Sequence, residues 1–344
     1  MLNSQIKGAF LAISAVFAAF SLTSCEREPA AFAGDGRSTV SFVLGSTRTR
    51  AAVTPHEGAV TSLDVLVFRS VEGTLDNAAR VASVNGEEVR SISVELTDGA
   101  SLDWYVVANA PEGALSFTSK AAFLEALTLL TQSTDRSLVM HGSGRLPSGP
   151  TEEPVRVALD RYACKVTVSS VIVDWPEAFT MASSVALGRI VLVNVVGSTP
   201  WSGVPAAGEP WYNRMDVESG LPAVVEDMTV KDYGGAALSP GVAYDAESPL
   251  YCMPNPTANN VNSLNTPQWS PRDTRVAVEI LLDGVPNWYP VDLPAMQCNH
   301  HYLINSLTVK GPGSAGPDYP VEREDIRFTV TVLPWDETTI PVSY

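Results

Sequence analysis

The sequence predicts an all-β protein built from β-sandwiches, with little helix. Short segments rich in Val and Ile recur along the chain, and several of them alternate apolar with polar residues. Gly, Pro or Asn bounds nearly all of these segments, and the chain holds 25 Pro and 24 Gly in total. The predicted strands lie within residues 38–44, 62–70, 104–110, 164–173, 189–196, 274–284, 302–311 and 326–333.

The first predicted strand, STVSFVL at residues 38–44, alternates polar and apolar residues. Side chains two residues apart share a face of a strand, so Val40, Phe42 and Leu44 point to the same side. The run RFTVTV at 327–332 alternates almost strictly, which predicts one buried face in the last strand as well.

Helix is expected at one place, residues 120–132, where Ala and Leu dominate. Phe123, Leu127 and Leu130 follow the i, i+4, i+7 spacing of a helical face, and Ser119 is suited to cap the N-terminus.

The length of 344 residues favours two domains. Pro and charged residues become frequent over 148–161, before a new set of strands, so we expect the boundary there. The segments 201–244 and 253–269 are rich in Gly, Pro, Asn and other polar residues, which predicts long surface loops on the second domain.

Near the start of the chain, the basic residue Lys7 is followed by an apolar run that ends in LTSC at residues 22–25. The run has the length of a signal peptide and is too short for a stable transmembrane helix. Its last four residues resemble a bacterial lipobox, which predicts lipidation at Cys25; the alternative is a plain signal peptide in which Cys25 is incidental. A diacyl modification would anchor the chain to a membrane.

Two arginines, Arg48 and Arg50, follow the first predicted strand in a chain with only 22 Lys and Arg. On the residues alone, they belong either to a solvated surface loop or to a site where the chain is processed. The net charge of −16 argues against binding to nucleic acid, whose phosphates need a basic face.

The residues give no sign of a catalytic, metal or cofactor site. His300 and His301 are adjacent, and neighbouring strand residues point to opposite faces, so they make a poor metal site. Cys164, Cys252 and Cys298 are expected mainly as small core residues, with one disulfide as the alternative. Four tryptophans in or near loops either cap a core or stack on sugars: Trp201, Trp211, Trp269 and Trp288.

Several stretches, in order, resemble the FimA/Mfa-type fimbrillin family of Bacteroides-related bacteria. They are LTSC, LDVLVF, WYVVANAP, RYACKVTV, LYCMPNP, NHHYLINSLTVKGPGS and FTVTVLPWDE. The last two carry most weight: a tyrosine strand that runs into a Gly-rich turn, and a closing strand that ends in Pro-Trp.

The resemblance implies two transthyretin-like β-sandwich domains in a lipoprotein that travels to the outer membrane and ends in an extracellular fimbrium. It implies that an arginine-specific protease removes the N-terminal segment with its first strand. This loss opens a groove, which the C-terminal strands of another subunit fill. The implied parts are a signal peptide at 1–25, a propeptide at 26–50 and domains at 51–155 and 156–344.

Arg50 is the first choice for cleavage and Arg48 the second. The strand donated to another subunit is expected from two C-terminal pieces, with Phe328, Val330 and Val332 in the first and Ile340 and Val342 in the second. Partners would be other copies of the chain, related pilus subunits, the protease, and host or bacterial surface ligands. The alternative is an accessory or tip adhesin that binds a glycan or a protein through second-domain loops.

Overall fold

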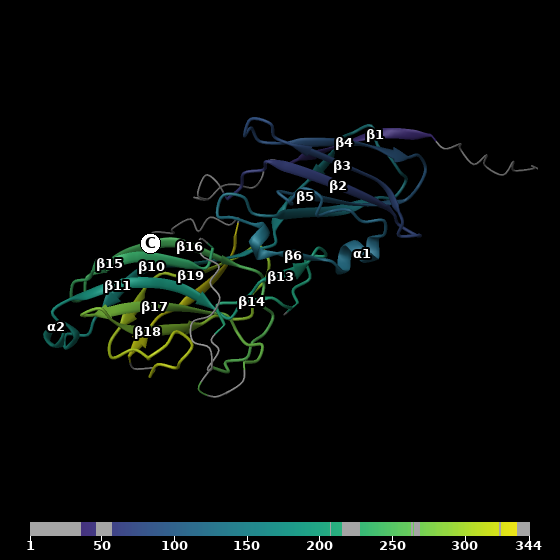
Figure 1. The fold of residues 1–344 in the computed structure, drawn as a ribbon. Coiled ribbons are helices and arrows are strands. Elements are labelled where there is room, and N and C mark those ends of the chain that lie inside the picture. The colour runs from purple at the N-terminus through teal and green to yellow at the C-terminus, as the bar shows by residue number, and fades with distance from the viewer. Residues whose placement is uncertain are drawn as a thin grey trace, which may run out of the picture. The chain divides into compact units, whose positions relative to one another are not determined.

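The computed structural model describes residues 36–45, 57–206, 208–214, 228–262, 264, 269–322 and 325–335. These residues belong to one compact unit. Their regular structure is almost entirely β-strand, with two short α-helices (Figure 1). The all-β fold with little helix that the sequence predicts is therefore confirmed.

Two sheets form from the strands that precede Cys164. The first has the order β4–β1–β8 and the second the order β3–β2–β5–β7–β9. Their strands are β1 (Arg37–Leu44), β2 (Ser62–Arg69), β3 (Leu75–Ala82), β4 (Ser91–Thr97), β5 (Leu102–Ala108), β7 (Met140–Leu146), β8 (Val155–Val157) and β9 (Asp160–Arg161). Apolar side chains of the two sheets meet in one hydrophobic cluster, so the pair is a sandwich.

The strand β2 is buried on both faces. Leu63, Val65 and Val67 belong to the cluster between the two sheets, whereas Leu66 and Phe68 belong to a second, larger cluster. Burial on both sides explains why this strand reads as a nearly continuous apolar run rather than an alternating one.

The strands from Cys164 onward form a second pair of sheets. One has the order β21–β20–β10–β19–β22, with β16 also paired to β10, and the other has the order β15–β11–β17–β18. Their strands are β10 (Cys164–Val173), β11 (Val185–Val193), β15 (Val230–Ala237), β16 (Tyr244–Cys252), β17 (Arg275–Leu282), β18 (Val285–Asp292), β19 (His300–Ile304), β20 (Leu307–Val309), β21 (Ile326–Arg327) and β22 (Val330–Pro334). Their apolar residues fill the larger cluster.

Small elements complete the described chain. Two-stranded ladders join β12 (Val195–Val196) to β14 (Trp211–Tyr212) and β6 (Leu127–Leu129) to β13 (Ser198–Pro200). The helices are α1 (Lys120–Glu125), α2 (Ala178–Met181) and a 3₁₀ turn at Leu130–Gln132. Among the residues with a described position, no helix is long and apolar enough to cross a membrane.

The helix expected over 120–132 is half as long as predicted. Ser119 caps its N-terminus as expected, with its side chain accepting a hydrogen bond from the Ala122 N–H. The helix ends at Glu125, because β6 pairs with β13 over Leu127–Leu129. Pairing with a strand that is distant in sequence therefore outweighs the local helical pattern.

An ion-pair cluster on β5 stabilises the first sandwich. The buried Asp103 carboxylate accepts hydrogen bonds from Lys120 Nζ at 2.7 Å and from Arg145 Nε at 2.6 Å. Burial alone would raise the pKa of Asp103, but the hydrogen bonds from Arg145 and Lys120 outweigh it and lower this pKa to about 2.

Asp103→Asn is expected to lower the free energy of unfolding by about 2 kcal/mol at pH 7. The folded-state pKa lies below the unfolded value, so the contribution is present above the unfolded pKa and is lost as the pH falls through about 2. We therefore expect the difference between wild type and variant to shrink by roughly half at pH 3. Urea unfolding at both pH values measures it.

Glu95→Gln is the control, because Glu95 lies exposed on β4 of the same sandwich. This variant should unfold like the wild type at both pH values. A loss that is equal at pH 7 and pH 3 in Asp103→Asn would contradict the charge-based explanation.

Candidate strand-exchange site

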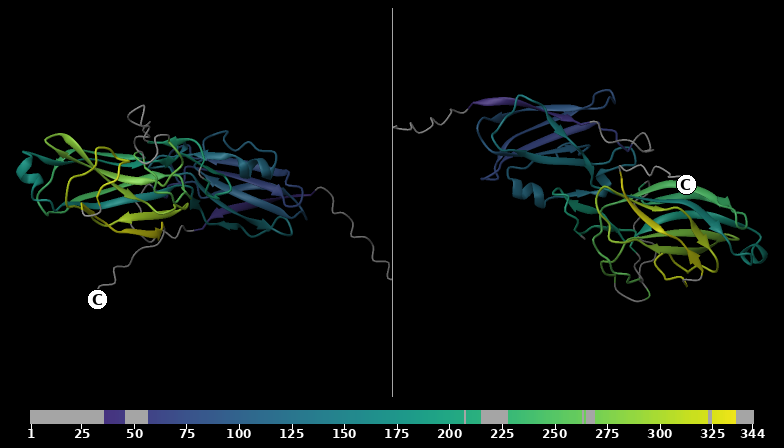
Figure 2. Two further views of the ribbon diagram at one scale, coloured as in Figure 1. Left: turned by 90° about the horizontal axis from the view of Figure 1, so that it is seen from below. Right: turned by 180° about the vertical axis from the view of Figure 1, so that it is seen from behind.

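The first strand, β1, is the central strand of its sheet. It pairs with β4 in antiparallel fashion from Arg37↔Thr97 to Val43↔Ser91, and with β8 in parallel from Phe42↔Val155 to Leu44↔Val157. In both views of Figure 2 it appears in purple beside the blue strands of the first sandwich. Because β1 lies between β4 and β8, its removal would separate these two strands and leave both with unpaired edges.

The inward side chains of β1 fill the core of the first sandwich. Val40 and Phe42 are 0% and 1% exposed, and Leu44 packs against the same cluster with partial exposure. The Phe42 ring meets Trp104 edge-on, with 5.4 Å between the ring centroids. On the opposite face, Ser41 Oγ lies 2.9 Å from Ser93 Oγ in an exposed position. The alternation in STVSFVL thus gave the correct inward face.

Five of the predicted site residues lie outside the described residues: Cys25, Arg48, Arg50, Ile340 and Val342. The two arginines fall in the segment 46–56, which follows β1 directly. Their processing and the lipidation of Cys25 stay predictions.

A buried carboxylate, Glu57, lies where the described chain resumes after the arginines. Its side chain is 0% exposed. Oε1 accepts hydrogen bonds from Lys165 Nζ at 2.7 Å and from the Tyr251 hydroxyl at 2.6 Å, and Oε2 accepts one from Trp335 Nε1 at 3.3 Å. We call these four residues the Glu57 cluster.

The charge of Glu57 is stabilised inside the protein. Burial by itself would raise its pKa, but the nearby Lys165 ammonium and the hydrogen bonds from the cluster hold the pKa below the ordinary value. Burial and the Glu57 carboxylate together raise the pKa of Tyr251, so this hydroxyl stays a donor. Glu57 is therefore a compensated buried anion rather than a proton-transfer group.

The last described residue, Trp335, is held by this cluster. It is 4% exposed, and its ring stacks on Tyr251 with 5.8 Å between centroids. The Arg161 guanidinium lies 4.8 Å from the centre of the Trp335 ring, at a distance suited to a cation–π contact. Sequence reasoning noted Pro-Trp as a family feature but missed Glu57, for which no local pattern gives a signal.

The C-terminal strand β22 lies at the edge of its sheet. It pairs with β19 from His300↔Pro334 to Ile304↔Val330. Of the three predicted donor residues in this region, Val330 packs partly buried against the larger cluster, whereas Phe328 and Val332 are 37% and 44% exposed. These three residues are thus not gathered into one core.

The histidines and cysteines occupy structural positions. His301 Nε2 lies 2.9 Å from Thr167 Oγ1, and burial lowers the His301 pKa to about 4. Cys164 and Cys252 face each other across β10 and β16 as buried free thiols, and burial raises the pKa of Cys164. Within the described part of the chain, no group of three potential metal ligands comes together.

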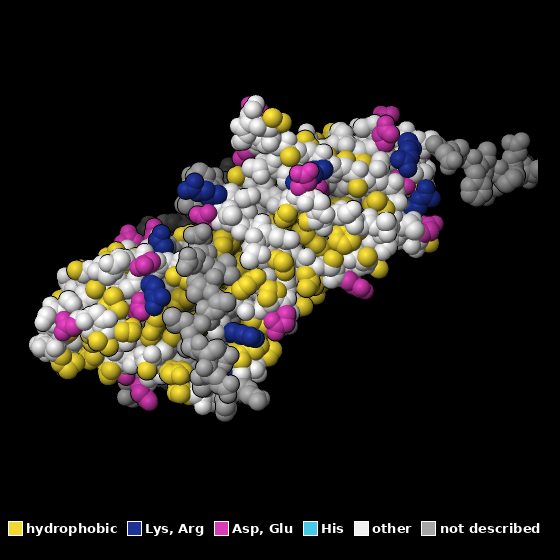
Figure 3. Space-filling view, in the orientation of Figure 1, with side chains coloured by type: hydrophobic (Ala, Val, Ile, Leu, Met, Phe, Trp, Pro, Cys, Tyr) yellow, Lys and Arg dark blue, Asp and Glu magenta, His cyan; other side chains and the backbone are white. Residues whose placement is uncertain are grey.

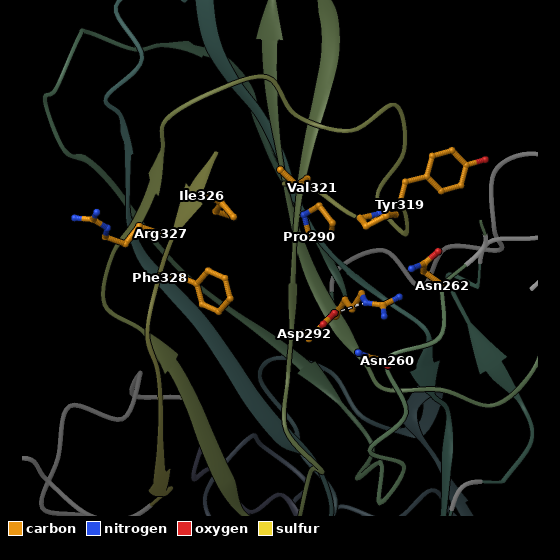
Figure 4. A pocket seen from close by; sticks show the side chains of 11 residues that line it. Asn260, Asn262, Pro290, Asp292, Tyr319, Val321, Ile326, Arg327 and Phe328 are labelled. Carbon is orange, nitrogen blue, oxygen red and sulfur yellow. Dashed lines mark hydrogen bonds and ion pairs between the residues drawn. The ribbon is translucent and has the colours of Figure 1, made fainter. Parts of the chain in front are cut away.

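A pocket of about 630 Å³ lies in the second sandwich, beside the edge strands β18 and β21. Figure 4 shows Ile326 and Phe328 on one side of it and Tyr319 and Asn262 on the other. Arg275 and Asp292 form an ion pair at its wall. The remaining lining residues are Asn260, Pro290, Pro320, Val321 and Arg327.

The charged surface has no concentrated basic region on the side drawn in Figure 3. There, Lys and Arg side chains are scattered among hydrophobic and acidic ones. A continuous basic face of the kind that binds phosphate backbones is not seen on this side of the described residues.

The comparisons with known proteins agree with the fold. Residues 38–151 match the model of the family described as major fimbrial subunit protein (FimA). No curated protein matches the chain in sequence. Among solved structures, a putative cell adhesion protein from Bacteroides eggerthii DSM 20697 shares 17% identity over 87% of this chain and 96% of its own, with a TM-score of 0.61.

Two proteins of Porphyromonas gingivalis are also similar. A fimbrilin (FimA) from strain W83 shares 16% identity over 86% of this chain and 97% of its own, with a TM-score of 0.60. The tip fimbrial protein Mfa3 shares 18% identity over 87% and 99%, with a TM-score of 0.50. At these identities the structures show the shared fold. Together with the family match, they confirm the resemblance to fimbrillins.

Phe42→Ala is expected to lower the free energy of unfolding by about 3–5 kcal/mol, because it leaves a cavity beside Trp104. Val43→Ala is the matched control on the same strand, since Val43 lies outside the buried cluster and should cost less than about 1 kcal/mol. Urea unfolding of both variants measures the difference. Equal losses of unfolding free energy in the two variants would contradict the conclusion that the inward side chains of β1 fill the core.

Proposed function

We propose that this chain is a structural subunit of a cell-surface fimbria, polymerised by strand exchange after proteolysis. The observation that carries the proposal is the place of β1, a central strand whose buried side chains precede two arginines closely in sequence. Cleavage after Arg50, or after Arg48, would detach the strand that fills the core. Strand exchange would then fill the core again with a strand from another subunit.

The proposal assigns a role to each part of the chain. Residues 1–25 are the signal peptide, with lipidation at Cys25, and residues 26–50 are the propeptide with β1. The mature subunit consists of a first domain at 51–155 and a second domain at 156–344. The lipidated precursor would be held at the outer membrane and the mature subunit would enter the extracellular fimbrium, where it supports adhesion.

The energetics favour refilling the groove. Removal of β1 would take the buried side chains of Val40 and Phe42 out of the core. Burial of each apolar side chain of this size stabilises the folded state by roughly 1.5–3 kcal/mol. The edges of β4 and β8 would be left with unpaired backbone groups, which attract another strand. An added strand restores both the ladder and the core, as in β-augmentation. Of the two C-terminal pieces, the first would supply Phe328, Val330 and Val332 as its apolar side chains, and the second Ile340 and Val342.

The partners follow from the geometry of such a contact. Groove and donated strand lie on different parts of one subunit, so the contact is heterologous and extends into a filament rather than closing. The partners are therefore other copies of this chain or related pilus subunits, with an arginine-specific protease acting before assembly.

A second candidate function is that of an accessory or tip adhesin, which the second-sandwich pocket favours. Its lining combines amide, carboxylate, guanidinium and phenol groups with the apolar Pro290, Val321 and Phe328. Ligand pockets commonly combine an apolar lining with a few polar groups that orient the ligand. Such a lining suits a sugar, which has hydroxyl groups and apolar ring faces.

Digestion of the purified precursor with an arginine-specific protease tests the first candidate. We expect a new N-terminus at Ala51 or Thr49 by mass spectrometry, followed by SDS-resistant ladders on electrophoresis. The double variant Arg48→Ala/Arg50→Ala is the control and should keep β1 and stay monomeric. A wild-type chain that is cut at Arg50 and still remains monomeric would overturn the proposal.

A glycan array with the monomer tests the second candidate. Arg327→Ala should weaken a detected glycan signal by about tenfold, the scale of one lost charged contact. Arg156→Ala, another exposed arginine located on β8, is the control and should leave the signal unchanged. The absence of binding to every glycan would contradict this candidate without affecting the first.

A further inference from the structure

Three cysteines of the second sandwich lie near the start of strand β10. Cys164 is the first residue of β10 and Cys252 is the last residue of β16, and both are 0% exposed. Cys298 lies in the segment before β19 and is partly buried. None of the three has a part in the strand exchange proposed above.

Cys164 and Cys252 are direct partners across the antiparallel β10–β16 ladder. Residues directly opposite each other in such a ladder place their side chains on the same face of the sheet. That face is turned to the core, because both cysteines belong to the larger hydrophobic cluster. The two thiols therefore enter the same buried space from neighbouring strands.

The backbone hydrogen bonds identify the type of this pair. The N–H of Tyr251 donates away from β10, to the carbonyl of Met228. Successive N–H groups of a strand alternate in direction, so the N–H of Cys252 points toward β10. Cys164 and Cys252 are thus a hydrogen-bonded pair, in which the Cα atoms lie about 5.5 Å apart. Disulfides span Cα–Cα distances of about 4.4–6.8 Å, so the separation across this pair suits a disulfide.

Cys298 has a different environment. Its Sγ lies 3.5 Å from the Gly203 carbonyl oxygen. It belongs to no described strand, so no sheet register places it opposite another cysteine. The Sγ of Cys164 lies 3.0 Å from the carbonyl oxygen of Gln297, the residue before Cys298. A link between Cys164 and Cys298 is therefore the alternative that a test has to exclude.

We propose that Cys164 and Cys252 form a cross-strand disulfide when the chain folds outside the cytoplasm, and that Cys298 stays a free thiol. The inference rests on the export that the proposed function requires, because disulfides form and persist in oxidising compartments. It depends neither on cleavage at the arginines nor on strand exchange.

The bond forms by exchange with an oxidant that is itself a disulfide. The thiolate of one cysteine attacks a sulfur of the oxidant, forms a mixed disulfide and releases one thiolate. The thiolate of the second cysteine then attacks the sulfur of the first and releases the other thiolate of the oxidant. The two cysteines are oxidised and give up their protons, and the oxidant is reduced to two thiols that take these protons up.

The exchange precedes the closing of the second sandwich. In the folded chain both thiols are fully buried, where a dissolved disulfide does not reach them. Burial also raises the pKa of Cys164, so the attacking thiolate does not form there. Oxidation therefore takes place in the unfolded or partly folded chain, and the pairing of β16 with β10 then encloses the bond.

The disulfide would lie beside the Glu57 cluster. Lys165 and Tyr251 both contact the Glu57 carboxylate, and they are the next partners along the same ladder. A covalent bond one position away would hold β10 and β16 in the register at which they bind this buried anion. It also closes the long loop 164–252, which constrains the unfolded chain.

Peptide mapping by mass spectrometry tests the proposal. The full chain carries Cys25→Ser, so that the thiol at the predicted lipidation site cannot exchange. It is unfolded and reduced, refolded with glutathione and glutathione disulfide, then alkylated in denaturant and digested. We expect a linked pair of peptides that contains Cys164 and Cys252, together with an alkylated Cys298. Cys298→Ala is the control and should keep the link. A link from Cys298 to either other cysteine, or alkylation of all three, would overturn the inference.

Urea unfolding with and without dithiothreitol provides a second readout. The oxidised chain should unfold at a urea concentration higher by about 1 M than the reduced chain, because the bond restricts the unfolded state. Cys252→Ala should remove this difference, and Cys298→Ala should leave it unchanged. Equal midpoints for the oxidised and the reduced chain would contradict the inference. Such a result leaves the proposed function untouched, since the protease test of strand exchange uses neither cysteine.

Discussion

The first sandwich depends on a core that is closed by a strand from before the two arginines. β1 is hydrogen-bonded on both sides and inserts Val40 and Phe42 among the side chains of the facing sheet. A central strand cannot be lost without exposing two ladder edges and an apolar groove at the same time. The processing proposed above would therefore convert a closed sandwich into an acceptor for another strand.

The Glu57 cluster imposes a second constraint, because a buried carboxylate is stable only when it is compensated. Desolvation of Glu57 is offset by the Lys165 ammonium and by hydroxyl and indole donors. The compensation also fixes geometry, since these partners come from β10, from β16 and from the residue after β22. Removal of one partner would leave a buried charge without its full set of donors, so the cluster favours a single arrangement of these strands.

The sequence was informative where the interactions are local. The alternation around Phe42 predicted both a strand and its buried face, and the Ser119 cap marked the start of a helix. The same local reasoning extended that helix beyond Glu125, because nothing near Leu127 reports its pairing with the distant β13. Glu57 was missed for a similar reason: its hydrogen bond to Trp335 spans 278 residues, and a single acidic residue after a loop has no pattern.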